Sequence, residues 1–198
     1  MKICFLHYHL KPGGVTTCLK QQIHALKDHC DVLVITGEKP DEAFPADTVI
    51  IPELAYSSLY PKPFHVQDVA AGIIDAIQTR FKGPCDILHV HNPMLAKNKK
   101  LLQILKALQK RGVCLLLQVH DFAEDGRPLS YYKEDYPEDC HYSVVNSRDY
   151  NILLKSGLKK DGLHLIFNTI KLPDIDAEVA AKDTDVVYPI RAIRRKNI

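Results

Sequence analysis

Short apolar segments rich in β-branched residues alternate along the chain with longer segments whose apolar positions recur at helical spacing. The short apolar segments predict strands at 2–7, 31–36, 48–51, 86–91, 113–120, 141–145 and 163–167. The longer segments predict helices at 15–27, 65–81, 95–111 and 147–156. This alternation is typical of an α/β fold with a mainly parallel sheet and helices on both of its faces.

Three segments refine this prediction. The segment 113–120 is the most apolar, which indicates a central strand buried on both faces. Residues 52–63 carry Tyr56, Tyr60 and three prolines, and they predict a long surface loop. Residues 121–140 are acidic and include a Gly-Arg-Pro turn, so we interpret them as an active-site loop.

The end of the chain differs from the rest. The sheet and its core are complete by about residue 170, which predicts a Rossmann-like domain over 1–170. Residues 171–185 are acidic and poor in strand signals, as in a linker. A short apolar run then begins a new unit, so residues 186–198 are expected to be the first strand and loop of a second domain.

Composition excludes several classes of protein. The 198 residues are 46% hydrophobic and 25% charged, which is ordinary globular composition. The net charge of +2 predicts no nucleic-acid partner. The six cysteines form no CxxC pair, and the chain opens directly into a strand without a signal peptide. Reduced thiols in a cytoplasmic protein are therefore expected.

One local excess of charge stands against this neutral background. The helix predicted at 95–111 has no acidic residue and carries six basic ones: Lys97, Lys99, Lys100, Lys106, Lys110 and Arg111. Such a face either rests on anionic lipid headgroups or is simply solvated, the more frequent case. Peripheral contact with the inner face of the membrane therefore stays open.

Polar side chains follow the predicted strands at the points where they end. In parallel α/β sheets, ligands bind beyond the carboxyl ends of the strands. The residues concerned are His7, His9, His89, His91, His120, Asp121, Asn146, Ser147 and Asn168. Any one histidine alone is more often a hydrogen-bonded structural residue, but together they predict a site at this edge.

A metal site is the first alternative for this edge. His89 and His91 lie on the same side of a strand, and His120 with Asp121 could complete a ligand set. Pro93 follows almost at once, and the longer His-rich spacing of hydrolytic metal sites is missing. We therefore expect no metal and no other cofactor.

Gly13 and Gly14 stand immediately before a predicted helix. Two residues without Cβ allow close approach, and free amides at a helix N-terminus attract an anion such as phosphate. A plain strand-to-helix turn would use the same glycines. The motif is not GxGxxG, and no acidic residue clearly closes the second strand, so a dinucleotide fingerprint is not matched.

Taken together, these pieces resemble the N-terminal, acceptor-side half of a retaining GT-B glycosyltransferase of the large family four (group 1) type. The likeness covers nearly the whole chain. It rests on Pro12-Gly13-Gly14-Val15, Asp86–His91, Val119-His120-Asp121, Val145-Asn146-Ser147 and Ile166–Asn168. The tail, Tyr188–Asn197, resembles the family's strand followed by Arg-x4-Lys, which opens its nucleotide-sugar-binding domain. Here Pro189-Ile190 stands where many members have a glycine.

The resemblance implies an activity: transfer of a sugar from a nucleotide-sugar donor to a carbohydrate or lipid-linked acceptor with retention of configuration. His120 would be catalytic, beside the reacting carbon. The donor would be bound by Gly13, Gly14, Asn168, Arg191 and Lys196. The acceptor would be bound by His9, His91 and Asp121. The family works without a bound metal and needs its C-terminal domain, so this chain alone is not expected to catalyse transfer.

The second interpretation is a stand-alone Rossmann-like module that binds a nucleotide or phosphate without catalysis. It uses the same Gly13-Gly14 helix start and predicts binding without turnover. A metal-dependent hydrolase is a distant third.

Overall fold

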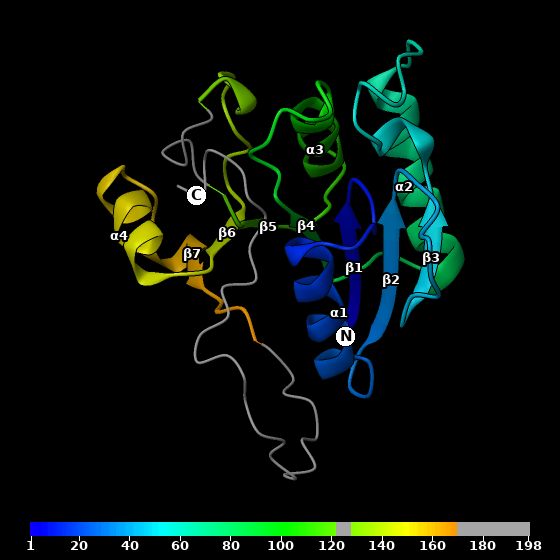
Figure 1. Ribbon diagram of the computed structural model, residues 1–198, viewed down its shortest axis with the longest axis horizontal. Helices are drawn as coiled ribbons and strands as arrows, with labels where there is room; N and C mark the ends of the chain where they lie inside the picture. Colours follow the sequence, from blue (N-terminus) through cyan, green and yellow to red (C-terminus); the bar gives the residue numbers. More distant parts are fainter. Residues whose placement is uncertain (122–127, 170–198) are drawn as a thin grey trace, which may run out of the picture.

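The computed structural model describes residues 1–121 and 128–169. Its centre is a seven-stranded sheet in the order β3-β2-β1-β4-β5-β6-β7, with every pair parallel (Figure 1). The strands are β1 Lys2–His7, β2 Asp31–Thr36, β3 Asp47–Ile50, β4 Ile87–His91, β5 Leu115–Val119, β6 His141–Val144 and β7 Leu163–Leu165. The helices are α1 Gly14–Leu26, α2 Val66–Phe81, α3 Leu101–Gln109 and α4 Ser147–Lys155. The predicted α/β, Rossmann-like fold is confirmed.

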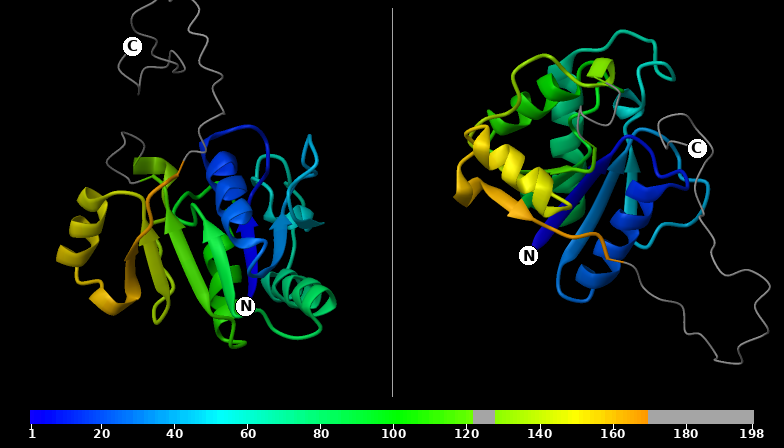
Figure 2. Two further views of the ribbon diagram at one scale, coloured as in Figure 1. Left: turned by 90° about the horizontal axis from the view of Figure 1, so that it is seen from below. Right: turned by 60° about the vertical axis from the view of Figure 1, so that its left-hand side comes forward.

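The sheet is covered on both faces, by different helices. Because side chains alternate along a strand, β1 sends Cys4 and Leu6 to one face and Ile3 and Phe5 to the other. The first face packs against α2, α3 and α4, and the second packs against α1 through residues that include Leu19. Figure 2 shows α1 on one side of the sheet with α2 and α3 on the other.

The predicted histidines of β1, β4 and β5 share the α1 side of the sheet. Phe5, which faces α1, is the register partner of His89. His91 follows two residues later on the same face, and its partner in β5 is Gln118. His120 comes two residues after Gln118. Strand register therefore brings these polar side chains together near the carboxyl ends of neighbouring strands.

Helix α3 is shorter than predicted and begins at Leu101 instead of residue 95. Before it, Leu95 makes an antiparallel bridge with Tyr131, and the Asn98 side chain is buried. Asn98 Nδ2 donates to the backbone oxygens of Glu53 and Ala55, at 2.6 and 2.8 Å. These contacts hold residues 95–100 out of the helix, because tertiary hydrogen bonds outweigh a weak local propensity.

The shortened helix removes the single basic face that the sequence predicted. Of the six basic residues, only Lys106 lies within α3. Lys100 Nζ instead donates to the Phe64 backbone oxygen at 2.6 Å, and the Lys97 ammonium lies 5.7 Å from the centre of the Tyr56 ring. The six basic residues therefore do not lie on one helical face. Among the described residues, no helix has the length and apolar character needed to span a bilayer.

Residues 52–63 also differ from the prediction. They begin with a 3₁₀ turn, Pro52–Leu54, and Leu54 has no exposed surface. Ala55 is buried as well and lies against Gly37, directly after β2. This segment therefore belongs partly to the core, and it is not wholly a surface loop.

The last predicted units cannot be compared with the structure. Strand β7 ends at Leu165, two residues earlier than predicted. The linker 171–185 and the unit 186–198, with Arg191 and Lys196, lie outside the described residues. So do residues 122–127 of the expected active-site loop.

Gly37 offers a test of this packing. A Cβ at position 37 would lie 2.0 Å from the Ala55 nitrogen, which is backbone and cannot rotate away. Gly37→Ala is therefore expected to lower the free energy of unfolding by about 2–3 kcal/mol, as overpacking does. Gly72→Ala is the matched control, because nothing lies within 4 Å of its Cβ in α2. It should raise stability by up to about 1 kcal/mol. Urea unfolding measures both, and equal effects would contradict this account.

Candidate functional site

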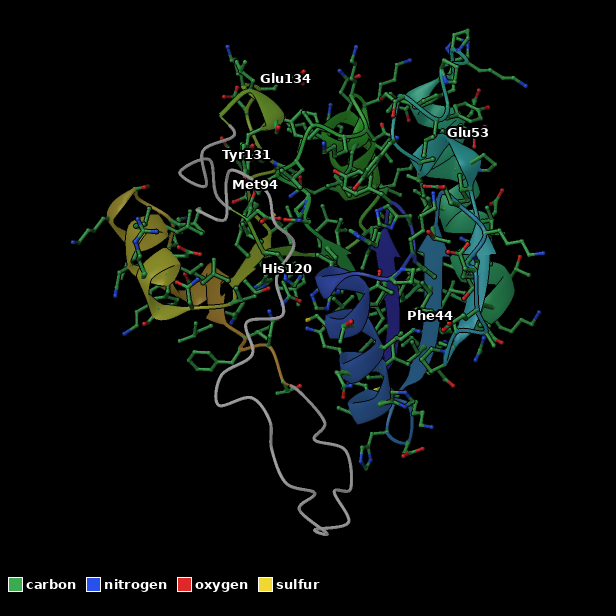
Figure 3. The ribbon with its side chains drawn as sticks, viewed as in Figure 1. Phe44, Glu53, Met94, His120, Tyr131 and Glu134 are labelled. Carbon is green, nitrogen blue, oxygen red and sulfur yellow. The ribbon has the colours of Figure 1, made fainter. Side chains whose placement is uncertain are left out.

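Four imidazoles form a continuous cluster at the carboxyl ends of β1, β4 and β5. His91 Nδ1 lies 3.0 Å from His120 Nε2. The rings of His89 and His91 stack with centres 4.6 Å apart. His7 Nδ1 donates to the His91 backbone oxygen at 3.2 Å. Figure 3 labels His120 at this edge of the sheet. The structure thus brings these predicted residues together.

His9 lies at the margin of the cluster. Its ring centre is 5.4 Å from that of His7, and its Nε2 is 3.2 Å from the Tyr56 hydroxyl. Tyr56 comes from the segment after β3, so the β1 end and this segment share one wall of the site. The sequence predicted His9 at this end of the strands.

Asn92 links the end of β4 to the end of β5 by two hydrogen bonds. It has a φ of 56°, in the left-handed region that asparagine tolerates. Its Oδ1 accepts from the His120 backbone nitrogen at 3.3 Å, and its Nδ2 donates to Asp121 Oδ2 at 2.8 Å. Asn92 therefore positions both His120 and Asp121. Sequence reasoning missed it, although an asparagine directly after a strand was the available signal.

Gln118 is the second residue that sequence reasoning missed. It is fully buried within β5, and its Oε1 accepts from Gln22 Nε2 of α1 at 2.9 Å. His89 Nε2 donates to the same oxygen at 2.9 Å. An amide inside the most apolar strand was the signal. Gln118 joins α1 to the histidine cluster.

Burial keeps the whole cluster uncharged at neutral pH. Desolvation, reinforced by neighbouring imidazoles, lowers the pKa of His7 to about 3 and that of His89 to about 4. Desolvation also lowers the pKa of His120 to about 4 and puts that of His91 well below its usual 6.5. These rings therefore act as neutral hydrogen-bonding groups.

His91 does not lie where its predicted role requires. Its side chain has 0% exposure, so the ring offers no surface to a molecule in a groove. Its ring contacts are Phe5, His7, His89 and His120. The burial of His91 disagrees with a place in the lining of an acceptor groove, and the ring contacts His120 from within the core.

The fold itself does not require Gly13 and Gly14. Gly13 has an extended φ of 171°, which any residue adopts, and its Cβ would meet nothing closer than 3.9 Å. A Cβ on Gly14 would have no neighbour within 4 Å. Within the described residues, no side chain caps the start of α1, and its first turn has no acidic residue. The result is a set of free amides that a ligand can approach closely.

A small hollow of about 220 Å³ adjoins this helix start, lined by parts of 10–20 and by Asp41, Glu42 and Phe44. Glu42 is 3.7 Å from the Lys20 ammonium, so its charge is partly offset.

Asn168 lies against α1, whereas Asn146 is the N-cap of α4. Asn168 Oδ1 accepts a hydrogen bond from Cys18 Sγ at 3.0 Å, which brings the chain after β7 to the α1 side of the sheet. Asn146 Oδ1 accepts from the Asp149 backbone nitrogen at 2.9 Å and caps its helix. Asn146 therefore has a structural role here.

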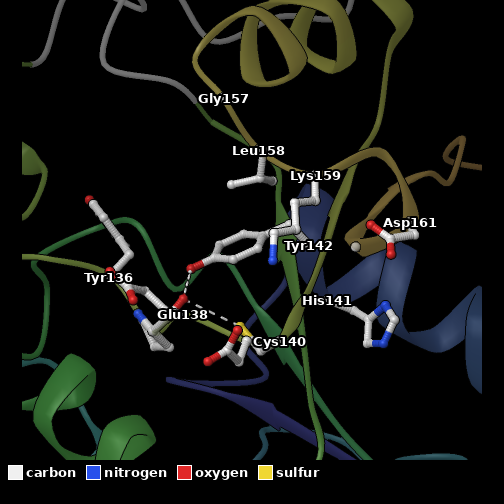
Figure 4. Close-up of a pocket in the computed structure, with 12 residues that line it drawn as sticks. Tyr136, Glu138, Cys140, His141, Tyr142, Gly157, Leu158, Lys159 and Asp161 are labelled. Atoms are coloured by element: carbon white, nitrogen blue, oxygen red, sulfur yellow. Dashed lines mark hydrogen bonds between the residues drawn. The ribbon is translucent and has the colours of Figure 1, made fainter.

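A larger pocket lies at the amino ends of the strands, opposite to the histidine cluster. It measures about 570 Å³ and lies between residues 136–142 and 157–162, at the amino ends of β6 and β7 (Figure 4). The Tyr142 hydroxyl donates to the Pro137 oxygen at 2.6 Å there. None of the predicted site residues lines this pocket, and it lies at the edge opposite to the one where parallel sheets bind ligands.

Within 1–121 and 128–169, no three His, Cys, Asp or Glu residues are grouped closely enough to hold a metal ion.

The chain is similar to known proteins both in sequence and in fold. A scan against models of known protein families finds no match. Mannosylglucosyl-3-phosphoglycerate synthase from Petrotoga mobilis is 26% identical over 235 residues, covering 97% of this chain and 45% of that protein. The crystal structure of Anabaena Alr3699/HepE in complex with UDP and glucose matches with a TM-score of 0.53 and 14% identity. Its complex with UDP-glucose matches with a TM-score of 0.51 and 16% identity.

The matched HepE structures share the fold of this chain but are longer than it. The HepE matches cover 86% of this chain but only 45% and 44% of the solved chains. The chain therefore spans less than half the length of the proteins it matches. At this level of identity, the structural likeness shows the fold.

The neutral histidines make stability depend on pH. A histidine whose pKa is lower in the folded state than in the unfolded state favours unfolding in acid. The free energy of unfolding is therefore highest above pH 6.5 and falls as the pH drops toward 4. Each buried histidine costs about 1.4 kcal/mol per pH unit in this range. About three protons should be taken up on unfolding at pH 5 by His7, His89 and His120, and His91 should add to this uptake.

The control is His89→Gln, which keeps a polar side chain beside Gln118. Urea unfolding between pH 5 and 7 should show uptake of about one proton fewer in this variant. An unchanged pH slope would mean that His89 is protonated in the native protein.

Proposed function

We propose that this chain forms the acceptor-side wall of a sugar-nucleotide-dependent glycosyltransferase. The supporting observation is one edge of the sheet that joins an uncapped, glycine-lined helix start to a neutral, partly exposed His120. The first is suited to a phosphate, and the second to a sugar hydroxyl. The comparisons support the same class: a synthase named for a mannosylglucosyl compound, and a protein crystallised with UDP-glucose.

The donor diphosphate would lie at the start of α1. Backbone amides from Gly14 onward offer hydrogen bonds, and the helix dipole adds about half a positive charge. The absent Cβ atoms of Gly13 and Gly14 let phosphate oxygens reach the amides. Arg191 and Lys196 belong to this proposal through the family resemblance alone, as residues that neutralise the departing diphosphate. Asn168 is proposed on the same side, beside α1.

Transfer would require stabilisation of the charge that develops as the bond between the donor sugar and the diphosphate breaks. The leaving diphosphate gains negative charge, and preorganised amides stabilise that state more than the ground state. A neutral His120 would hold the donor sugar by a hydrogen bond near the reacting carbon. The acceptor would then attack from the same face through a short-lived oxocarbenium-like ion pair, which retains configuration. No metal is part of this proposal.

The acceptor would enter beside His9, Tyr56 and Asp121. His9 and Tyr56 contact each other at the end of β1, and Asp121 is held by Asn92 at the end of β5. These groups present hydrogen-bonding surface suited to a carbohydrate or lipid-linked acceptor. The opposite wall would come from a C-terminal domain of the same protein, and we place the enzyme in the cytoplasm. Activity is therefore to be measured on the full-length protein.

The first test is His120→Ala in the full-length protein. Removal of a hydrogen bond used in the transition state should lower kcat by about 100-fold or more. The melting temperature should fall by only a few degrees, because His120 is partly exposed. His141→Ala is the control: His141 pairs with His164 at the far edge and should leave kcat unchanged. If His120→Ala loses activity only in proportion to folded protein, His120 is structural.

The second test is Gly14→Val. A Cβ at position 14 would have no atom of the described residues within 4 Å, so the melting temperature should change little. The added side chain would occupy the space proposed for the diphosphate, so the KM for the nucleotide-sugar donor should rise about tenfold or more through lost hydrogen bonds. Steady-state kinetics with varied donor measures this. An unchanged KM would place the diphosphate elsewhere.

A binding module without catalysis is the remaining candidate, because the same helix start would serve it. It predicts that the full-length protein binds a nucleoside diphosphate in calorimetry but shows no sugar transfer or donor hydrolysis. Detectable turnover that depends on His120 excludes it.

A further inference from the structure

The contact between His91 and His120 has the geometry of a hydrogen bond within the ring planes. The facing nitrogens, Nδ1 of His91 and Nε2 of His120, are 3.0 Å apart. The two rings are within 18° of coplanar, and their centres are 5.2 Å apart. Imidazole lone pairs lie in the ring plane, so edge-to-edge rings of this kind share one proton between the facing nitrogens.

The other nitrogen of His91 decides which ring supplies that proton. Within the described residues, His91 Nε2 is buried and has no hydrogen-bond partner. A neutral imidazole carries a single N–H group. A proton on Nε2 would be an orphaned buried donor, which proteins rarely tolerate, whereas a proton on Nδ1 is paired with His120. The proton of His91 therefore belongs on Nδ1.

We propose that His91 is a positioning residue: it donates Nδ1–H to Nε2 of His120 and thereby holds His120 as its Nδ1–H tautomer. His120 then presents an N–H donor to the site, and its own Nδ1 has no partner among the described residues. Under the proposed function, this N–H would donate to an oxygen of the donor sugar. In this state, His120 has no lone pair to offer as a general base.

The surroundings hold both rings in place. The His91 backbone is held through its oxygen, which accepts from His7, and its ring is stacked on His89. The His120 backbone nitrogen donates to Asn92. Rotation of either ring would break the shared hydrogen bond and bury an unpaired nitrogen. The tautomer of His120 is thus determined by a residue that has no exposed surface.

The direct test reads the tautomer itself. Two-bond ¹H–¹⁵N spectra of the histidine-labelled protein at pH 7 distinguish a protonated ring nitrogen from a bare one. His120, assigned by its loss in His120→Ala, should show a protonated Nδ1 and a bare Nε2. The reverse pattern would overturn the proposal. This result does not depend on activity, so it stands or fails separately from the proposed glycosyl transfer.

A pair of variants then tests the role in turnover. His91→Leu removes the donor and should lower kcat of the full-length protein about tenfold, as loss of one hydrogen bond does. The KM for donor should change little, and His120 should show a mixture of tautomers. His91→Asn keeps an N–H donor at the position of Nδ1 and should restore most of the kcat and the single tautomer.

His89→Leu is the control, because it removes the stacking on His91 but leaves the bond to His120. It should lower the melting temperature while the His120 tautomer stays Nδ1–H. If His91→Leu retains the wild-type tautomer, or if folded His91→Asn shows the mixture expected for His91→Leu, the proposal is wrong. Should His91→Leu fail to fold, His91→Asn and the wild-type spectrum still decide.

Discussion

The parallel pairing of β1 with β4 is the constraint on which the rest of this structure depends. It reverses the strand order at the middle of the sheet and leaves the carboxyl ends of β1, β4 and β5 side by side. Parallel strands require crossovers, which place α1 on one face and α2 and α3 on the other. His7, His89, His91 and His120 come together because these strand ends lie side by side.

Burial then sets the chemistry of that edge. Imidazoles in water would be partly protonated near neutrality, but desolvation lowers the pKa of His7, His89, His91 and His120 and keeps them neutral. Positive potential at this edge comes instead from the N-terminus of α1, which no side chain of the described residues caps. Neutral donors beside a fixed helix dipole suit a ligand with both sugar hydroxyls and phosphates. The combination of neutral histidines with a helix N-terminus is the physical basis of the proposed function.

The matched proteins put that combination in context. The solved HepE structures share the fold of this chain, and each matched protein is more than twice as long as the part that matches. A site on one edge of a sheet is open on its other side, so a second wall is needed to exclude water during group transfer. The proposal therefore assigns to this chain one half of a cleft.

Much of the fold followed from local pattern. β1 and β2 were predicted with the bounds the structure has, because their apolar runs end where polar residues begin. The start of α3 was not, because the buried hydrogen bonds of Asn98 to Glu53 and Ala55 join residues over 40 positions apart. The burial of Leu54 was missed for a similar reason: its covering lies elsewhere in the chain.

The sequence by itself determined that histidines end these strands and that they gather at one edge, since side chains alternate and parallel strands align. It could not separate His91 from His120, because both follow the same pattern of apolar strand and polar end. Only the tertiary structure decided that one is sealed in the core and the other is partly exposed. The physical reason is that burial, ring contacts and protonation depend on neighbours from other strands, which no local pattern specifies.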